Sequence, residues 1–214
     1  RGLGDVYKRQ VINKPFDMPA HPSAGNHDNT LANALMYYYG SQNKPFVYRC
    51  INRLDRDTTG LTIVAKHALA GGILGNAVAK RAIHRTYYAV CSGCTPICMR
   101  ISAPIARKDA STIERCVDFK RGENAVTDFI RIKYNPDNNL SLVKLRLLTG
   151  RTHQIRVHMK YIGFPLIGDF LYNPDYTYIS RQALHSGRLV FTHPVTGQKM
   201  NLISDIPSDM KSLF

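Results

Sequence analysis

Apolar and polar residues alternate over several short stretches of the chain, and these stretches predict strands. Leu145 and Leu147 alternate with Lys144 and Arg146, which is the pattern of a strand with one buried face. The stretch 61–65 is apolar and rich in β-branched residues, as strands often are. The full set of expected strands comprises 61–65, 85–90, 125–134, 140–148, 184–192 and 199–202, with a strand end at 11–15.

Two stretches in the first half of the chain repeat their apolar residues every three or four positions, as amphipathic helices do. The first helix is expected at 28–39, where Asn29 or Thr30 can cap its N-terminus. The second is expected at 67–80, with Leu69 in its apolar stripe. Strands joined by turns and interrupted by helices predict one α+β domain with a largely antiparallel mixed sheet flanked by helices.

A third helix is expected after Thr152, which can cap it, and it ends at Ile162. At 3.6 residues per turn, His153, Arg156 and Lys160 share one face, opposite an apolar face that would pack on the sheet. A cation near a helix N-terminus opposes the helix dipole, which favours an anion bound nearby. This helix therefore predicts cationic donors that face a carboxylate or a phosphate.

The charge of the chain narrows the class of partner. The 214 residues include 29 Lys and Arg against 15 Asp and Glu, a formal net charge of +14. Such an excess favours a polyanion such as RNA, although a merely basic surface is the alternative. The sequence shows neither an apolar run of about 20 residues nor a signal peptide, so we expect no membrane partner and a cytoplasmic location.

Five cysteines, an odd number, favour reduced thiols. Cys91, Cys94 and Cys98 lie close together in the sequence, and His84 could complete a set of four zinc ligands. Zinc sites of this kind usually have a second pair of ligands further along the chain, and the sequence shows none. We therefore expect no metal, and keep a zinc or redox protein as an alternative.

Asp55 is the candidate for chemistry because of its surroundings. It lies between Arg53 and Arg56, just before the strand at 61–65, so a rigid element would hold it. An Asp in such a loop often only orders a turn, which is the alternative here. Tyr87 and its neighbour lie on a strand, where adjacent side chains face opposite ways, so only one of them can face a cleft.

These segments, in this order, resemble the RluA-type RNA pseudouridine synthases from Val11 nearly to the C-terminus. The long motif at 149–158 is the most specific part, and its co-occurrence with Arg-Leu-Asp at 53–55 supports the resemblance. The matching segments are Asn13-Lys14-Pro15, Arg53-Leu54-Asp55, Thr58-Thr59-Gly60-Leu61, Tyr87 with Ala89 and Gly93, Thr149 to His158, Gly168-Asp169 with Tyr172, His185 before Leu189, and His193-Pro194.

The resemblance implies a role for each matching residue. Asp55 would be the catalytic aspartate, Tyr87 the base-stacking tyrosine that assists proton removal from C5, and Arg156 the partner of the aspartate. Arg53 would fill the gap left by the flipped base. The remaining basic residues expected to hold RNA are Lys14, Arg151 and Lys160, and the residues expected to brace the site are His153, Gln154, Thr59, Gly60 and His158, with Gly168-Asp169 forming a tight turn.

The resemblance also implies a fold, a reaction and a partner. The fold would be one catalytic domain at 11–214 with a central active-site cleft, preceded by a non-matching lead-in at 1–10. The reaction would turn uridines of ribosomal or transfer RNA into pseudouridine, by a monomer without a cofactor. Asp55 could attack C1′ or remove the C2′ proton, and both routes need an ionised carboxylate.

Some positions depart from the family pattern. Asn52 stands where histidine is usual, Thr59 where serine is usual, and Arg85 where lysine is usual. These changes affect contacts that flank the site. The sequence before Asn13 matches poorly and contains no S4-type RNA-binding domain, which leaves open whether further residues precede it. A non-catalytic RNA-binding or ribosome-assembly module with the same fold is the other alternative.

Overall fold

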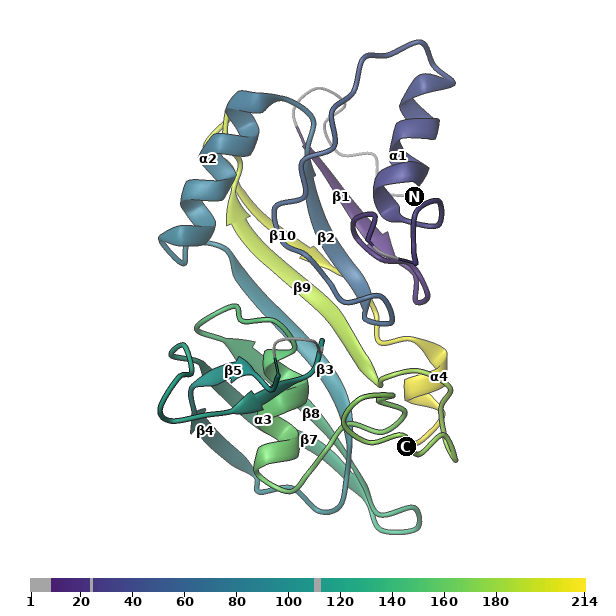
Figure 1. Cartoon of the computed structure of the whole chain (residues 1–214), viewed down its shortest axis with the longest axis vertical. Coiled ribbons are helices and arrows are strands. Elements are labelled where there is room, and N and C mark those ends of the chain that lie inside the picture. The colour runs from purple at the N-terminus through teal and green to yellow at the C-terminus, as the bar shows by residue number, and fades with distance from the viewer. Residues whose placement is uncertain (1–8, 24, 110–112) are drawn as a thin grey trace. The chain divides into compact units, whose positions relative to one another are not determined.

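The structure, a computed structural model, describes residues 9–23, 25–109 and 113–214 (Figure 1). The chain divides into two compact units, each with its own apolar core. The first unit comprises the chain up to His84 together with Arg188–Ser204. The second comprises Arg85–Gly187 and Asp205–Phe214.

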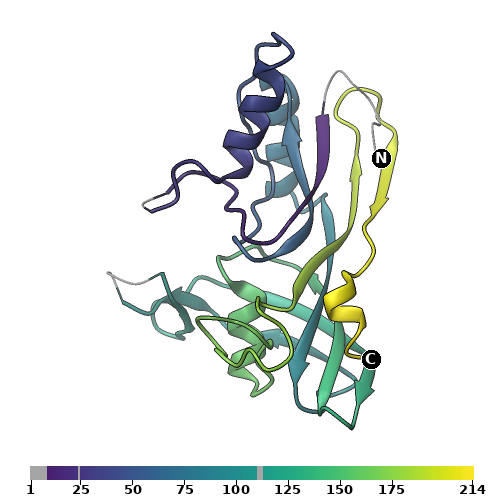
Figure 2. The ribbon, with the colours of Figure 1, turned by 90° about the vertical axis from the view of Figure 1, so that its right-hand side faces the viewer.

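The strands of the first unit are β1 (Arg9–Lys14), β2 (Thr59–Ala65), most of β9 (Leu184–Thr192) and β10 (Lys199–Ile203). They are ordered β1-β2-β9-β10, and β1 pairs with β2 and β9 with β10 in antiparallel register. Figure 2 shows β9 and β10 as a two-stranded ribbon. Asn13 and Lys14 lie opposite Leu61 and Gly60, so this register brings the Asn-Lys-Pro motif next to the Asp55 segment.

Two helices cover β2, and this is why all seven of its residues are buried. Helix α2 (Ala68–Ala79) packs Ala70 and Leu74 on Leu61, Ile63 and Ala65. Helix α1 (Leu31–Gly40) packs Leu31 and Leu35 on Val64, which points to the other face of the strand. A strand covered on both faces has an uninterrupted apolar sequence, as residues 61–65 do, apart from Thr62.

The second unit is a sheet in the order β9-β3-β8-β7-β4 with a hairpin and helix α3 against it (Figure 1). Strand β3 pairs with β8, β4 with β7, β5 with β6 and β7 with β8, all in antiparallel register. Val90 and Leu140 pack with Met210 of α4 in its core. The elements are β3 (His84–Ser92), β4 (Cys98–Ser102), β7 (Val126–Asn135), β8 (Leu140–Leu147), the hairpin of β5 (Ile105–Arg107) and β6 (Arg115–Val117), α3 (Gln154–Tyr161) and α4 (Ser208–Lys211).

The expected α+β class and the mainly antiparallel strands are confirmed, and each expected helix and strand is present. Two details were wrong. Leu69 does not belong to the buried stripe of α2, because its side chain is 74% exposed and Ala70 is buried in its place. The N-cap of α3 is His153 rather than Thr152. Residues 154–159 of α3 are all buried, so both its apolar face and the face that carries Arg156 are covered.

The expected lead-in at 1–10 lies mostly outside the part of the chain that the structure describes. Residues 1–8 lie outside the described residues, while Arg9 and Gln10 belong to β1, opposite Ala65 and Val64. The longest described helix, α2, has 12 residues, and no helix in the described ranges could cross a bilayer.

Candidate active site

The segment that carries Asp55 is tied to β2 before the aspartate. The side chain of Asn52 accepts a hydrogen bond from the Ile63 amide (2.8 Å) and donates to the Leu61 carbonyl (3.4 Å). The hydroxyl of Thr62 donates to the carbonyl of Asn52 at 2.6 Å. Asn52 is buried, so the chain enters the Asp55 segment from a fixed point.

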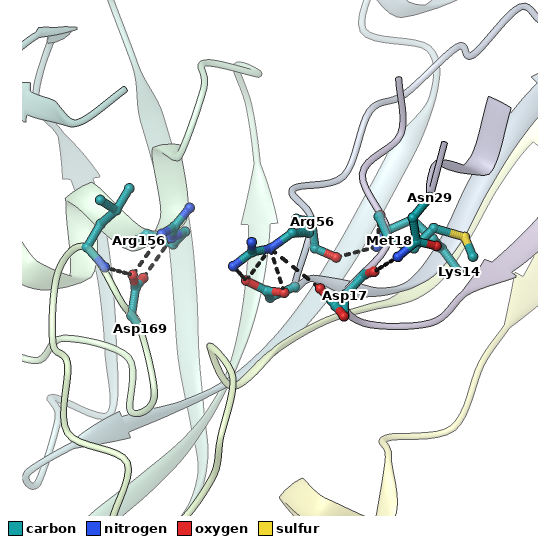
Figure 3. A network of polar contacts seen from close by, with 9 residues as sticks. Lys14, Asp17, Met18, Asn29, Arg56, Arg156 and Asp169 are labelled. Atoms are coloured by element: carbon teal, nitrogen blue, oxygen red, sulfur yellow. Dashed lines mark hydrogen bonds and ion pairs between the residues drawn. The ribbon is translucent and has the colours of Figure 1, made fainter. Parts of the chain in front are cut away.

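The same segment is tied again after the aspartate. The carbonyl of Arg56 accepts from the ammonium of Lys14 (2.7 Å) and from the amide of Met18 (3.2 Å), as Figure 3 shows in part. The Thr58 amide donates to the Asp55 carbonyl at 3.1 Å, which closes a turn. Gly60, the second residue of β2, has a φ of 107°, a conformation that favours glycine. The half-buried Asp55 side chain therefore stands on backbone fixed at both ends.

Lys14 has a different role from the one expected. Its side chain is 1% exposed, and its ammonium donates to the carbonyls of Pro15, Met18 and Arg56 at 2.7, 2.9 and 2.7 Å. An ammonium has three N–H donors, so these bonds use all of them. We therefore assign Lys14 to holding the Asp55 segment in place of the expected contact with an RNA phosphate.

The two arginines beside Asp55 differ in their contacts. Arg56 makes a bidentate ion pair with Asp57, with Nε–O distances of 3.1 and 3.2 Å, and lies 3.9 Å from Asp17 (Figure 3). Arg53 is exposed. The pKa of His21 is lowered mainly by burial of its ring, and the positive charge of Arg53 lowers it further. Arg56 thus helps to order the turn, while Arg53 lies on the surface, where it can reach a ligand.

Arg156 is held by a carboxylate within the second unit. Its Nε and one terminal nitrogen each lie 2.7 Å from an oxygen of Asp169, in a parallel bidentate pair (Figure 3). The two side chains are 2% and 0% exposed. Asp169 also accepts from the amides of Leu171 and Tyr172, so it forms the expected tight turn. The anion predicted near the start of α3 is present in this unit as Asp169.

Aromatic rings and a histidine surround this pair. The guanidinium carbon of Arg156 lies 5.0 Å from the ring centre of Tyr172 and 5.4 Å from that of Phe170. The Tyr172 hydroxyl accepts the Arg115 amide proton and lies 2.9 Å from Nδ1 of His153, to which it can donate. Burial raises the pKa of Tyr172 to about 12, so the hydroxyl keeps its proton at neutral pH. These contacts fix the orientation of the guanidinium plane.

Two further polar residues of α3 brace its position. Gln154 donates to the carbonyl of Val126 and the hydroxyl of Thr127, and accepts from the Thr149 hydroxyl and the Arg151 amide. His158 is fully buried, and its ring nitrogens lie 2.9 Å from Thr127 Oγ1 and the Ala103 carbonyl oxygen. Burial lowers the pKa of His158, so its ring is neutral at pH 7. Both residues join α3 to the sheet.

The remaining candidates are placed as follows. Tyr87 lies on β3 opposite Leu145 and is buried, while Tyr88 is half-buried against the core. Arg151, three residues before α3, and Lys160, near the end of α3, are both exposed. The ammonium of Lys160 lies 5.6 Å from the centre of the Tyr172 ring. Asp55 and Arg53 thus belong to the first unit, and Tyr87 and Arg156 to the second. The pairing of Asp55 with Arg156 stays a prediction.

The cysteines considered as zinc ligands differ in exposure. Cys91 is buried in β3, and burial raises the pKa of its thiol, whereas Cys94 and Cys98 are exposed. Among the described residues, no group of three or more His, Cys, Asp or Glu side chains converges as metal ligands would.

Sequence reasoning missed the contact between Asp169 and Arg156, since nothing in the spacing of these two residues indicates that they meet.

Comparisons with known proteins agree with these motifs. The family model for RNA pseudouridylate synthase matches residues 10–161. The RNA pseudouridine synthase YhcT of Bacillus subtilis is 39% identical over 204 residues, covering 95% of this chain and 67% of that protein. The ribosomal large subunit pseudouridine synthase D of Zymomonas mobilis is 38% identical over 221 residues, covering 95% of this chain and 68% of that protein.

A solved structure shows the same fold. Human RNA pseudouridylate synthase domain containing 1 superposes with a TM-score of 0.78 at 25% identity, covering 94% of this chain and 81% of that one. The family match extends over most of the chain and includes the Asp55 segment, β3 and α3. The chain belongs to the RNA pseudouridine synthase family, whose members are isomerases.

Proposed function

We propose that this protein converts specific uridines of ribosomal RNA into pseudouridine, with Asp55 as the catalytic carboxylate. The observation that carries the proposal is the Asp55 segment itself, which is fixed by Asn52 before the aspartate and by Lys14 after it. Fixing the backbone around one carboxylate is what a catalytic group requires, because a misplacement of about 1 Å can cost about 100-fold in rate. Ribosomal RNA is favoured over transfer RNA by the name of the Zymomonas mobilis relative.

The reaction sets the roles of the other residues. The N1–C1′ bond of uridine breaks, the uracil turns, and a new bond forms between C5 and C1′ with loss of the C5 proton. An ionised Asp55 can attack C1′ or take the C2′ proton, and a nearby cation would favour the ionised form. Arg156 is proposed as that cation, and the bidentate contact with Asp169 supports this by fixing the orientation of its guanidinium.

The target base has to leave its stack before it can react. Tyr87 is proposed to stack on the flipped uracil and to assist removal of the C5 proton. Arg53 is proposed to fill the vacated position, a role that its exposure on the surface supports. No electron or phosphate is transferred, so the reaction itself calls for no metal or organic cofactor. We propose that the protein acts as a monomer in the cytoplasm, and light scattering of the purified protein tests its oligomeric state.

The test is to map pseudouridines in total RNA from a synthase-depleted host, with and without this protein, by carbodiimide-dependent reverse-transcription stops, so that ribosomal and transfer RNA are both read. New stops are expected with the wild-type chain. Asp55→Asn is nearly isosteric and should lower the rate by about 100-fold to 10,000-fold or more, with RNA binding retained. Arg156→Ala should lower the rate of the chemical step more than it lowers the affinity for RNA.

Each contrary result has a separate meaning. If Asp55→Asn forms pseudouridine at the wild-type rate, Asp55 is not the catalytic residue. Binding of uridine-containing RNA without any product would favour the non-catalytic RNA-binding module. Product in transfer RNA alone would keep the reaction and change the substrate. A fall confined to affinity in Arg156→Ala would make Arg156 a phosphate contact.

A further inference from the structure

The second unit contains a cavity of about 530 Å³ that no step of the proposed reaction uses. Four arginines and one glutamate line it, so its walls are strongly cationic. A volume of this size accommodates a small organic ligand or a segment of one. The lining residues are Ile105, Ala106, Arg107, Arg115, Arg121, Glu123, Gly150, Arg151 and Thr152.

Two of the arginines face each other across the β5–β6 hairpin. Arg107 and Arg115 are direct cross-strand partners, and like charges in that position destabilise a hairpin. The neighbouring pair is complementary, since Lys108 and Glu114 form an ion pair at 3.0 Å. Arg107 and Arg115 both line the cavity, so an anion bound there would meet two guanidinium groups.

The other two arginines are oriented by neighbouring oxygens. Arg121 pairs with Asp118 at 2.7 Å, and Arg151 pairs with Glu123 and donates from Nε to the carbonyl of Asn124 at 3.1 Å. The Glu123 side chain is 69% exposed, so an incoming anion can displace it at little cost. A guanidinium that is held at one edge presents its remaining donors in a fixed direction.

Gly122 makes this arrangement possible. A Cβ at Gly122 would lie 2.3 Å from the carbonyl oxygen of Asp118 and 2.7 Å from the backbone of Pro104. The chain can therefore turn tightly there and place Arg121 and Glu123 on the cavity wall. Beside Gly150, another lining residue, the guanidinium of Arg85 lies 3.3 Å from where a Cβ would stand, which places another cation near the site.

We propose that this arginine pocket binds a backbone phosphate of the substrate RNA at a nucleotide other than the target uridine. Planar guanidinium groups match phosphate oxygens in bidentate geometry, and the Thr152 hydroxyl adds a donor that suits a phosphate or a 2′-hydroxyl. The chain carries a net charge of +14, which suits a polyanion better than a single small anion. The proposal rests on the proposed function, because it takes RNA to be the substrate.

The experiment compares the salt dependence of RNA binding for wild-type protein and for Arg107→Gln combined with Arg115→Gln. An oligouridylate probe and the ribosomal RNA transcript modified by wild type are titrated over a series of salt concentrations. For single-stranded RNA, the slope of log K against log salt is expected to fall in magnitude by about 0.7 for each phosphate that the variant no longer neutralises. The KM for the transcript should rise while kcat changes little, since the pocket touches no reacting atom.

The matched control is Arg100→Gln combined with Arg146→Gln, which removes two charges beside Asp128, on strands β4 and β8 away from the pocket. The control should keep the wild-type slope. If the salt slope of Arg107→Gln with Arg115→Gln is unchanged, or if it falls equally in this variant and in the control, the pocket does not bind an RNA phosphate. Saturable stabilisation of wild type by uridine monophosphate together with an unchanged RNA slope would also overturn it.

A second variant and a comparison with the activity assay keep the proposal testable. If the double glutamine variant does not fold, Arg107→Lys with Arg115→Lys keeps the charge without the planar donors, and should weaken affinity at a nearly unchanged slope. Wild-type affinity in that lysine variant would overturn the bidentate contact. If wild type forms no pseudouridine while the pocket variant still shows the smaller slope, the proposed function fails and the phosphate site stands.

Discussion

The two segments that carry the proposed catalytic pair are held in different ways. Around Asp55, side chains of Asn52 and Lys14 bond to backbone groups, so the protein fixes the main chain and the carboxylate projects from it. Around Arg156, the guanidinium itself is fixed, by a buried bidentate carboxylate and by two aromatic rings. The aspartate is placed by the backbone beneath it, whereas the arginine is oriented at its functional end.

This difference suits the proposed roles of the two residues. A group that forms or breaks a bond must adjust as the reaction proceeds, and a firmly placed backbone allows its side chain small movements. A group that supplies only charge works best when it is preorganised, because then no reorganisation accompanies the reaction. The comparison predicts that damage to the arginine support will cost most in stability, and damage to the Asp55 support more in activity.

The largest effect is expected for Asp169→Ala. It leaves the buried Arg156 without its carboxylate, and breaking a buried ion pair in this way destabilises a protein by about 3–5 kcal/mol. Urea unfolding monitored by circular dichroism measures the change. Asp128→Ala, which breaks the exposed pair with Arg100, is the control and should cost much less. Equal destabilisation in the two variants would show that the burial of Asp169 adds nothing to its effect on stability.

A double variant sharpens this result. Arg156→Met with Asp169→Leu replaces the ion pair by apolar side chains of similar size, which is often neutral for stability. It should recover most of the stability missing in Asp169→Ala and still form no pseudouridine at a measurable rate. Recovery of activity along with stability would show that the pair has no role in the reaction.

The next effect in size is expected for Lys14→Met. It leaves three carbonyl oxygens without the ammonium, at a cost of about 1–3 kcal/mol for buried acceptors that stay unsatisfied. Since one of these carbonyls belongs to Arg56, kcat should fall even where the protein remains folded. Lys44→Met, at an exposed lysine, is the control. If Lys14→Met changes only the affinity for RNA, Lys14 contacts an RNA phosphate, as the resemblance implied.

A smaller effect is expected for Asn52→Ala. It removes the side-chain hydrogen bonds to Ile63 and Leu61 and should cost about 1 kcal/mol in stability. The Asp55 segment is then no longer attached to β2 by this side chain, so kcat should fall by a larger factor than stability alone explains. Thermal unfolding and single-turnover rates, measured on one preparation, separate the two. Unchanged kcat would mean that the Lys14 side of the segment is sufficient.

The smallest effect is a decrease of stability in mild acid that arises from His158. Burial lowers its pKa below 6.5 in the folded protein, so below that pH the unfolded chain binds more protons than the folded one. Stability therefore falls as the pH drops through 6.5 towards the folded pKa, and this contribution is fully present above pH 6.5. Melting temperatures of wild type and His158→Gln, compared from neutral to mildly acidic pH, should differ in slope. Parallel curves would assign the acid sensitivity to other groups.

The sequence was a good guide wherever local pattern decides structure. The strand at 61–65 and the helix with its cap at Thr30 follow from residue type and spacing, and both are present. The three-stranded run of β4 and the β5–β6 hairpin was missed, because its strands are short and its burial pattern is irregular. Their edges are set by pairing with β7 and with each other, which no local pattern reports.

The candidate site shows the same division. The motifs indicated which residues matter, but the side-chain partners depend on contacts far apart in the sequence. Lys14 was expected to meet RNA as one of the basic residues around the site, and only the fold shows three carbonyls around its ammonium. The helix pattern placed Arg156 on a polar face, and the residues that cover that face come from the segment at 169–172.

Strand β9 has a consequence for how the chain reaches this structure. Its residues 184–187 belong to the second unit and 188–192 to the first, where Leu189 and Phe191 complete the core with Ile63 and Leu74. During synthesis, the segment up to His84 therefore cannot complete its core until residues 188–192, about a hundred positions later, have been made. Domains otherwise generally fold one after another as they emerge from the ribosome. Contacts that span such a distance along the chain slow folding, so the first unit should be the last to become protected from hydrogen exchange.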